Sequence, residues 1–582
     1  MTRSIRALAG LAAAASALVW MQTPAPAAGP PALTMPVQAT KIDLDPGRLY
    51  SSPAMAVDPK NPLRMVGGWA DLRTRRCGLV RSVDGGSTWV RPDASPNTAS
   101  FPFCSQSQGG VIQAPTAFGG DGMLYMALNG WGTEEAARTG GAVMVARSSD
   151  LGDSWETVVV RNAREKTGND AENIRPVQSI AVDAKGGAND VVYVTFSRSV
   201  TNPPAPNAVP ARPMVAVSRD GGRTFAEAVN LAEGVFEPQA LRDQALAAVT
   251  TTTAAPGPTT TTTIPPADSK AATPNQVGNF GSAGSRNGMV ARVDSKGTAY
   301  VMWPTGAANI TPAPPGGLAL SKSTDGGKTW SSAVSIPFSY NNATGGPASA
   351  YPQFQVSPKT GALHIVYNRN PTPETTGLSE VYNRVSYDGG ATWSEAKPLS
   401  DDDPKNYGGQ FFPNLSIAPN GRVDVAWWDT RDIQGLRGTD AYYAYSNDDG
   451  RTFSKNIRLT DRSIDRKLGI WGNNYDIASQ PGVASTNAYA VFGWDDTRNS
   501  DLGFSDSKTT GGGLQDIYVA AAQFEAIGGG SSNTAKVILA AAIGLLIVGV
   551  VVLLAAMVTR RRGGPAPHDK TAGSERVTAK VE

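Results

Sequence analysis

Short apolar runs recur along most of this chain, each four to eight residues long and bounded by Gly, Pro, Asn or Asp. Val191–Phe196, Val423–Trp428 and Ala488–Trp494 are three of them. Runs of this length with these bounding residues are typical of β-strands. No helical period competes with them in this part of the chain. The pattern therefore predicts an all-β fold.

The runs fall into seven similar units, each with a first strand near a proline, a second apolar strand, a third strand that leads into a polar turn, and a fourth strand. The last unit, from about residue 476 to 524, has three strands, and Val37–Leu44 is a spare strand at the start. We expect this N-terminal strand to complete the last blade, because closure removes open sheet edges. The prediction is a β-propeller of six or seven four-stranded blades over residues 37–525, with six if the first or last unit is only a cap.

One polar turn recurs in six of the units, with the pattern Ser-x-Asp-x-Gly-x-(Ser/Thr)-(Trp/Phe). Its copies are 60 to 70 residues apart, apart from one step of 105. Asp accepts hydrogen bonds from nearby backbone N–H groups, and Gly supplies positive φ, so the motif is typical of a tight turn. We expect a structural role for its six aspartates, which are Asp84, Asp150, Asp220, Asp325, Asp388 and Asp448.

This turn resembles the Asp box of the sialidase (BNR-repeat) superfamily. The resemblance spans residues 82 to 453 and implies a β-propeller. Known sialidases have six blades, which differs from the seven units counted here. Asp boxes also occur in propellers that are not sialidases, so the resemblance is specific for the fold and weak for the activity.

Both ends of the chain predict export and membrane anchoring. Residues 1–28 have two arginines, an apolar run and a small-residue cleavage site, as in a signal peptide. Val537–Val558 is an apolar run without a charge, followed by Arg560–Arg562, which predicts a transmembrane helix over 537–559 and a cytoplasmic tail over 560–582. Residues 526–536 would be a juxtamembrane linker. We expect a single-pass cell-membrane protein with an extracellular propeller.

The composition of the chain limits the kinds of ligand and site that it can have. The 52 basic and 50 acidic residues give a net charge of +2, so no global field favours nucleic acid. Two histidines leave no His-based triad and no His-rich metal site, and we expect no metal and no cofactor. The long step of 105 contains a Thr/Pro-rich insertion, 247–275, that cannot bury a core. Cys77 and Cys104 are the two cysteines, and in an exported protein they predict a disulfide, with two buried thiols as the alternative.

A second motif, Trp-x-Asp-x-Arg, occurs at the end of the second strand in units one, six and seven. These units are contiguous around a closed ring of seven, so their loops would form a charged rim on the face opposite the Asp boxes. Such a rim could bind a polar ligand, or the pairs could be salt bridges that only pin their own loops. The pairs are Asp71 with Arg73, Asp429 with Arg431, and Asp496 with Arg498.

The starts of the inner strands should line the central funnel. By register these positions are Ser52, Ala114, Arg175, Asn287, Tyr351, Phe412 and Gln480. Arg175 is at one of these starts, in a sequence that resembles a variant of the sialidase Phe/Tyr-Arg-Ile-Pro motif, whose arginine binds the sialate carboxylate. The resemblance further implies a tyrosine nucleophile backed by Glu, and an Asp acid/base. Tyr351 and Tyr475 are candidate nucleophiles, and Asp71 is the candidate acid, although no Tyr–Glu pair is marked by a motif.

Two functions fit these residues. The first is a cell-surface, sialidase-like propeller that recognises glycans, or another anionic or polar surface ligand, with exo-α-sialidase-type hydrolysis as its enzymatic form. The second is a non-catalytic propeller that binds a protein or a cell-wall polymer. A sialoside hydrolysis assay separates the two.

Overall fold

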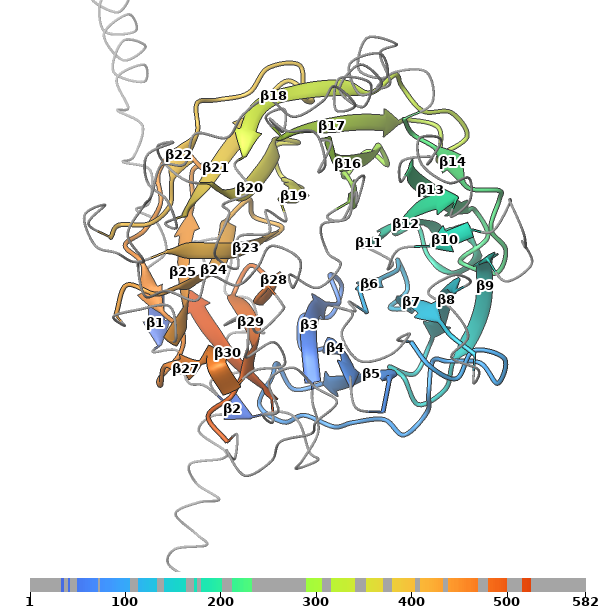
Figure 1. The fold of residues 1–582 in the computed structure, drawn as a ribbon, viewed down its shortest axis with the longest axis horizontal. Coiled ribbons are helices and arrows are strands. Elements are labelled where there is room, and N and C mark those ends of the chain that lie inside the picture. The colour runs from blue at the N-terminus through green and yellow to red at the C-terminus, as the bar shows by residue number, and fades with distance from the viewer. Residues whose placement is uncertain are drawn as a thin grey trace, which may run out of the picture. The chain divides into compact units, whose positions relative to one another are not determined.

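The computed structural model describes seventeen stretches of the chain. They are residues 33–35, 40–41, 50–71, 74–104, 114–132, 141–163, 172–174, 179–200, 212–232, 289–305, 316–340, 352–369, 379–402, 409–432, 438–468, 480–499 and 515–524. All of them lie in one compact unit, residues 32–525. Their strands form seven antiparallel sheets that follow one another around a ring (Figure 1), so the fold is an all-β propeller of seven blades.

Blades 1 to 4 follow the chain in order, each running from the centre of the ring outward. Blade 1 is β3 (Tyr50–Val57), β4 (Met65–Asp71) and β5 (Arg76–Ser82). Blade 2 is β6 (Thr116–Phe118), β7 (Leu124–Gly130), β8 (Ala142–Ser148) and β9 (Glu156–Asn162). Blade 3 is β10 (Glu172–Ile174), β11 (Ser179–Asp183), β12 (Val191–Val200), β13 (Arg212–Ser218) and β14 (Val229–Asn230), with the 3-10 helix η3 (Gly187–Asn189). Blade 4 is β15 (Val290–Val293), β16 (Ala299–Thr305), β17 (Gly316–Ser323) and β18 (Val334–Tyr340).

Blades 5 to 7 continue the ring. Blade 5 is β19 (Gln353–Val356), β20 (Leu363–Arg369), β21 (Glu380–Ser386) and β22 (Lys397–Pro398). Blade 6 is β23 (Gln410–Ile417), β24 (Val423–Asp429), β25 (Gly438–Ser446), β26 (Ile457–Arg458) and β27 (Ile464–Asp465), followed by the 3-10 helix η4 (Arg466–Leu468). Blade 7 is β28 (Gly482–Ser485), β29 (Tyr489–Asp496) and β30 (Asp516–Phe524), joined by β1 (Leu33–Met35) and β2 (Thr40–Lys41).

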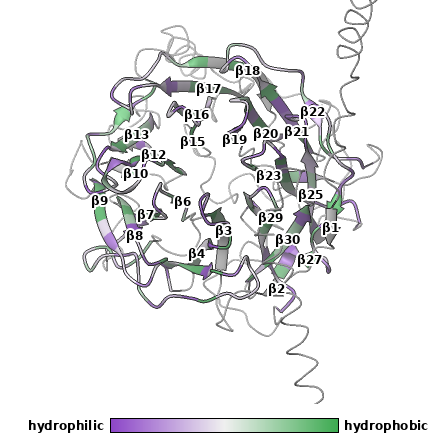
Figure 2. Ribbon diagram, turned by 180° about the vertical axis from the view of Figure 1, so that it is seen from behind, coloured by the Kyte–Doolittle hydropathy of each residue, from purple (hydrophilic) through white to green (hydrophobic). Residues whose placement is uncertain are grey.

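Burial along a strand depends on its place in the blade. All seven residues of the second strands β4, β7 and β24 are buried, because a neighbouring blade covers each face of these strands. The outer strand β9 has no buried residue. Hydrophobic and hydrophilic strand residues can be followed around the ring in Figure 2. The apolar runs of the sequence thus mark mainly the second and third strands.

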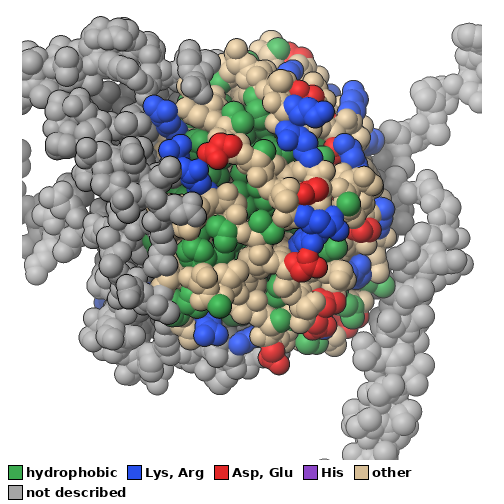
Figure 3. Space-filling model, turned by 90° about the vertical axis from the view of Figure 1, so that its right-hand side faces the viewer, with side chains coloured by type: hydrophobic (Ala, Val, Ile, Leu, Met, Phe, Trp, Pro, Cys, Tyr) green, Lys and Arg blue, Asp and Glu red, His purple; other side chains and the backbone are tan. Residues whose placement is uncertain are grey.

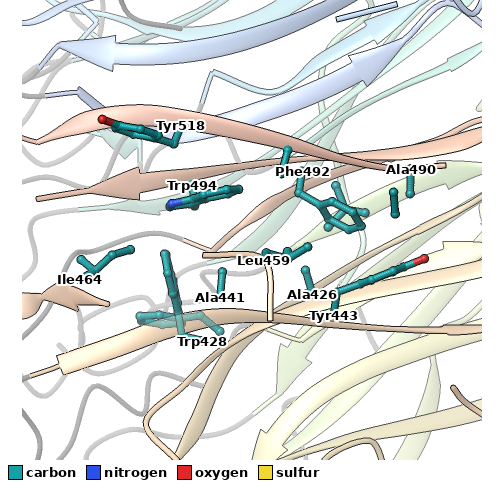
Figure 4. Packing of buried hydrophobic residues seen from close by; sticks show 14 of the residues in the cluster. Ala426, Trp428, Ala441, Tyr443, Leu459, Ile464, Ala490, Phe492, Trp494 and Tyr518 are labelled. Carbon is teal, nitrogen blue, oxygen red and sulfur yellow. The ribbon is translucent and has the colours of Figure 1, made fainter. Parts of the chain in front are cut away.

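Hydrophobic packing joins the blades into a closed ring. Within the described residues, seven buried clusters occur, one at each interface between neighbouring blades. Between blades 6 and 7, Trp428 and Tyr443 lie opposite Trp494 and Phe492 (Figure 4). Between blades 7 and 1, Val491 and Val519 pack with Met65 and Trp69. This last cluster settles the number of blades at seven.

The N-terminal segment completes blade 7, as the count of strands predicted. Leu33 pairs with Phe524 in β1, and Thr40 pairs with Val519 in β2, both antiparallel to β30. The segment begins at Leu33 and is broken into two short strands, whereas the sequence suggested one run over Val37–Leu44. It covers the free edge of β30, which would otherwise offer unpaired backbone groups.

The six Asp boxes fold into the same turn. In the first, the Asp84 carboxylate accepts hydrogen bonds from the Thr88 backbone N–H (2.9 Å) and the Thr88 hydroxyl (2.6 Å). Ser82 donates to Asp84 at 2.7 Å and accepts from the Gly86 N–H at 2.8 Å, a role of the leading serine that the sequence did not indicate. These four contacts recur in the other five boxes.

Two boxes lack the glycine that usually follows the aspartate. Gly85 in the first box has a φ of 74°, in the left-handed region that favours glycine. Leu151 and Asp449 take its place in two boxes, with φ values of 57° and 56°. The turn therefore holds its shape even where the residue is not glycine.

Several expectations lie outside the described residues. They are the signal peptide (1–28), the insertion 247–275, the linker 526–536, the transmembrane run 537–559 and the tail. Among the residues that are described, we find no helix long and apolar enough to cross a membrane. The cysteines are described: Cys77 and Cys104 are joined in a disulfide with a Cα–Cα distance of 5.8 Å. It ties β5 to the segment before blade 2, within the blade 1–2 core.

Candidate functional site at the charged rim

The Trp-x-Asp-x-Arg turn of blade 6 is a closed set of hydrogen bonds. The Asp429 carboxylate accepts from the Arg431 backbone N–H at 2.8 Å and from Arg431 Nη2 at 2.7 Å. Trp427 Nε1 also donates to Asp429, at 3.1 Å. The Asp429 side chain is fully buried. The tryptophan that begins the motif thus helps to hold the carboxylate, and the arginine closes the turn over it.

Blade 7 repeats the same geometry. Asp496 accepts from the Arg498 N–H at 2.8 Å, from Arg498 Nη2 at 2.7 Å and from Trp494 Nε1 at 3.1 Å. The guanidinium of Arg498 lies 4.1 Å from the centre of the Tyr518 ring. The two motifs therefore encode one structure, which we call the rim clamp.

Each rim clamp also takes a carboxylate from the preceding blade. Arg431 contacts Asp401 at 2.7 Å, and Asp401 follows the outer strand of blade 5. Arg498 contacts Asp461 at 2.7 Å, and Asp461 follows strand β26 of blade 6. These two acids occupy the same place in Leu-(Ser/Thr)-Asp, at Leu399–Asp401 and Leu459–Asp461. The sequence reading missed them, although this short repeat after the outer strand was a visible signal.

Charge and burial act against each other in the clamp. Burial raises the pKa of Asp429, because desolvation outweighs the hydrogen bonds and charge supplied by Arg431. Burial opposes charge on Arg431 too, but its bonds with Asp429 and Asp401 raise the pKa of the guanidinium above its ordinary value. Arg431 therefore stays cationic and is committed to two carboxylates. This is the arrangement expected if the pairs pin their loops.

Further polar groups surround the clamps on blade 6. Asp440 accepts from Arg458 Nη2 at 2.8 Å, from the Thr460 hydroxyl at 2.7 Å and from the Ser463 hydroxyl at 3.0 Å. Tyr442 donates its hydroxyl to Asp432, which is exposed, and its ring lies under Arg431 at 4.3 Å. Fixed carboxylates, a phenol and arginines at a loop face can bind the hydroxyl groups of a polar ligand.

Asp71, the predicted acid, lies at the corresponding end of strand β4 in blade 1. Its side chain accepts from the Thr74 hydroxyl at 2.6 Å and from the Thr74 N–H at 3.3 Å, and the residue is 1% exposed. Its motif partner Arg73 lies outside the described residues. So do the other predicted site residues, Arg175, Tyr351 and Tyr475, whose roles stay predictions. The described predicted residues are Asp71, Asp429, Arg431, Asp496 and Arg498.

A central channel lies between the inner strands of the seven blades. It encloses about 380 Å³ and is lined by the inner strands. Gln353 and Gln355 line the channel from blade 5, Asn414 from blade 6 and Gln480 from blade 7. Alanines make up much of the lining from blades 1 to 3. Gln353 donates to Gln480 at 2.9 Å. The channel therefore has a polar arc and an apolar arc.

Two of the predicted funnel positions face elsewhere. Ala114 and Phe412 are buried in the cores between blades 1 and 2 and between blades 6 and 7. In blade 6 the pairing of β23 with β24 shifts between Phe411 and Asn414, and Phe412 has a φ of 51°. A bulge at Pro413 turns the phenylalanine out of the channel. Gln480, by contrast, does line the channel.

No metal-binding group of His, Cys, Asp or Glu side chains occurs among the described residues. The side of the ring in Figure 3 shows basic and acidic side chains intermixed.

Comparison with known proteins gives distant structural likenesses. No family model matches the chain, and no curated protein matches it. A Dyadobacter fermentans DSM 18053 protein of unknown function is 12% identical, with a TM-score of 0.41, over 74% of this chain and 96% of that one. A Hadza microbial sialidase is 13% identical, with a TM-score of 0.38, over 80% and 74%. Trypanosoma rangeli sialidase with the inhibitor DANA is 11% identical, with a TM-score of 0.36, over 74% and 56%.

At such identities and TM-scores these likenesses carry no argument about the site. The argument for the fold comes from this chain: seven blades in a closed ring, six of them carrying the Asp-box turn. The Asp-box resemblance predicted a β-propeller, and the arrangement of the strands confirms it. In fold, the chain is a seven-bladed β-propeller that carries six Asp-box turns.

Proposed function

We propose that the chain is a cell-surface-anchored, sialidase-like propeller whose charged rim recognises glycans. The observation that carries the proposal is the rim of blades 6 and 7, where two clamps and the Asp440 cluster hold carboxylates and arginines in fixed positions. Preorganised polar groups lose little conformational entropy when they bind hydroxyl-rich ligands. Loops at one end of a rigid scaffold are a frequent place for binding residues.

Recognition needs fewer assumptions than hydrolysis. In the hydrolytic form, Arg175 would hold the carboxylate of an anionic sugar, Tyr351 or Tyr475 would attack the anomeric carbon, and Asp71 would transfer the proton. A proton donor must come within hydrogen-bond reach of the glycosidic oxygen. Asp71 is 1% exposed and bonded to Thr74, so this role requires the turn to open. We therefore place recognition first and hydrolysis second.

The binding test uses the full-length protein on an array of acidic and neutral glycans. Asp432 is exposed on the rim and accepts a bond from Tyr442, so Asp432→Asn should lower affinity for a bound glycan about tenfold while the fold is kept. Asp93→Asn, an exposed acid near the first Asp box, is the matched control. Retention of only a protein or a cell-wall polymer, with no glycan bound, would favour the non-catalytic alternative.

The hydrolysis test measures turnover of a fluorogenic sialoside. We expect Arg175→Ala to lower the rate about a hundredfold if the enzymatic form is right. Arg219→Ala is the control, because Arg219 is in the Asp box of the same blade and donates to the Gly326 carbonyl at 2.8 Å. Equal rates in both variants, or no turnover in the parent, would reject hydrolysis and leave recognition standing.

Anchoring rests on the sequence of the two ends. We propose that residues 1–28 direct export and that 537–559 hold the protein in the membrane. Truncation after residue 536 should release the protein into the medium. Truncated protein that stays with the membrane fraction would count against this anchor.

A further inference from the structure

The central channel contains one charged side chain among its described lining residues, and that side chain is Arg292. It comes from the inner strand β15 of blade 4. No ion pair joins it to a carboxylate of the described residues, whereas the rim arginines Arg431 and Arg498 each contact two. An unpaired cation in a cavity is costly unless an anion joins it.

The height of Arg292 in the channel follows from strand pairing. Val293 pairs with Ala299, which pairs with Ser323, the first residue of an Asp box. Arg292 therefore lies one residue above the Asp-box level, at the end of the channel away from the rim clamps. This separates it from the site proposed for glycans.

The same pairing identifies the side chains around Arg292. One residue above the Asp-box serine, the five other blades that carry an Asp box place three alanines on one arc and a glutamine and a serine on the other. These are Ala56, Ala117, Ala181, Gln355 and Ser416, and all of them line the channel. We call this ring the Arg292 layer. The guanidinium extends from this layer to the Ala291 carbonyl and the Ser179 hydroxyl, and none of the five layer side chains is acidic.

The described residues satisfy only part of the hydrogen-bonding capacity of the Arg292 guanidinium. Arg292 Nη1 donates to the Ala291 carbonyl at 2.7 Å and to the Ser179 hydroxyl at 3.2 Å. The Nε–H is buried and without a partner. Among the described residues no hydrogen bond is made by Nη2 either. Nε and Nη2 form one edge of the guanidinium, the edge that binds a carboxylate with two parallel bonds.

Burial acts on this arginine without an opposing acid. It lowers the pKa of Arg292 to about 10, and no carboxylate of the described residues raises it again. Arg292 is still protonated at neutral pH, so its positive charge needs a counter-ion. Because Arg292 carries the only charge of this layer, an anion with one negative charge balances it better than an anion with two.

We propose that the central channel binds one monovalent anion, a carboxylate group or a halide, on the free edge of Arg292. The site is independent of the glycan rim. An anion there would also stabilise the inner strands, because it would neutralise the charge that they surround.

The experiment follows line broadening in chloride NMR with the purified full-length protein. The parent should give saturable broadening, which formate reverses. Arg292→Gln should weaken chloride binding about tenfold or more. Arg223→Gln, an exposed Asp-box arginine, should bind like the parent. Absent broadening in the parent, or equal broadening in Arg292→Gln, would overturn the proposal.

A second variant keeps the test valid if Arg292→Gln does not fold. Gln355→Glu places a carboxylate in the Arg292 layer, on the next inner strand, as a built-in counter-ion. It should abolish chloride broadening and raise the thermal midpoint in chloride-free buffer. Unchanged broadening in this variant would reject the site. Reversal by formate but not by bromide identifies a carboxylate site, and stronger reversal by sulfate than by either would reject a monovalent one.

Discussion

On one face of the ring, Asp84 accepts hydrogen bonds from Thr88 and Ser82 in a turn that faces water. On the opposite face, Asp429 accepts bonds from Arg431 and Trp427, and its side chain is fully buried. The faces are opposite because the first turn follows the third strand of a blade and the second follows the second strand. Both turns hold an aspartate with several donors, yet they shift its pKa in opposite directions.

The difference comes from burial. Burial raises the pKa of Asp84, but the bonds from Thr88 and Ser82 outweigh it, and the net pKa is lowered. Bonds from Ser154 hold the pKa of Asp150 at about 2 in the second box. In Asp429 the desolvation is larger and wins. Neutral donors therefore suffice to stabilise the carboxylate of an Asp box, whereas the buried carboxylate of a rim clamp needs its arginine.

The largest expected effect is removal of that arginine. Arg431→Ala would leave the Asp429 carboxylate buried without a counter-ion, which costs about 3–5 kcal/mol of unfolding free energy. Urea unfolding of the full-length protein measures the loss. Arg451→Ala is the control, since Arg451 is exposed in the Asp box of the same blade. A loss below about 1 kcal/mol would mean that the clamp contributes no more to the free energy of unfolding than a surface ion pair.

The Asp box should give a smaller loss. Asp84→Ala removes an acceptor of three hydrogen bonds in an exposed turn, and we expect a loss of about 1–2 kcal/mol, as for a capping aspartate. Thr88 and Ser82 can turn to water, which limits the effect. The comparison variant is Asp93→Ala, at an exposed acid just beyond the box. If Asp84→Ala cost as much as Arg431→Ala, burial would not be the distinction between the two turns.

The pH dependence should separate the turns by sign. A box aspartate has a folded pKa below its unfolded value, so its stabilisation is present above about pH 4 and is lost as the pH falls towards 2. Asp429 has a raised folded pKa, so acid favours its folded state. Asp220→Asn should therefore flatten the loss of stability between about pH 4 and 2. Asp429→Asn should instead remove the gain in stability that Asp429 supplies as the pH falls towards about 4, and should leave the slope below pH 4 unchanged. Unfolding free energies from about pH 7 to 2 measure both effects, and the same change of slope in both variants would refute the contrast.

The sequence predicted the parts of this fold that depend on local periodicity. Apolar runs marked the strands, and the repeated Asp boxes fixed their order, so the boxless unit after residue 476 and its N-terminal partner strand could be recognised. The Trp-x-Asp-x-Arg motif correctly paired Asp429 with Arg431, because both residues belong to one turn.

Contacts between blades could not be predicted in the same way. Asp401 and Asp461 reach the clamps from the preceding blades, and only the ring geometry brings them there. Phe412 was placed in the funnel by counting residues, but a bulge adds one residue and reverses which side chains face inward. The sequence did not indicate Arg292 as a site residue. Its lack of a counter-ion follows from the absence of acidic channel-lining residues on the other described inner strands.

The smallest expected effect concerns the outer acid of the clamp. Asp401 is about half exposed (46%) at its side chain and contacts Arg431 beside the buried Asp429. Solvent screens such a pair, so Asp401→Asn should cost only about 0.2–1 kcal/mol, less at high salt. Asp461→Asn should match it in blade 7, where the acid is 58% exposed. Urea unfolding at low and high salt measures both.

These two variants test whether the buried acid or the exposed acid supplies most of the stabilisation by the clamp. If the buried acid supplies the stabilisation, the exposed acid only orients the arginine across the blade boundary, and asparagine keeps that contact as a neutral acceptor. Asp402→Asn, next along the chain, provides the baseline. A loss from Asp401→Asn close to that from Arg431→Ala would mean that the stabilisation lies between the blades. The rim clamp would then act as an interblade bond, whereas the hydrogen bonds of an Asp box lie within its own turn.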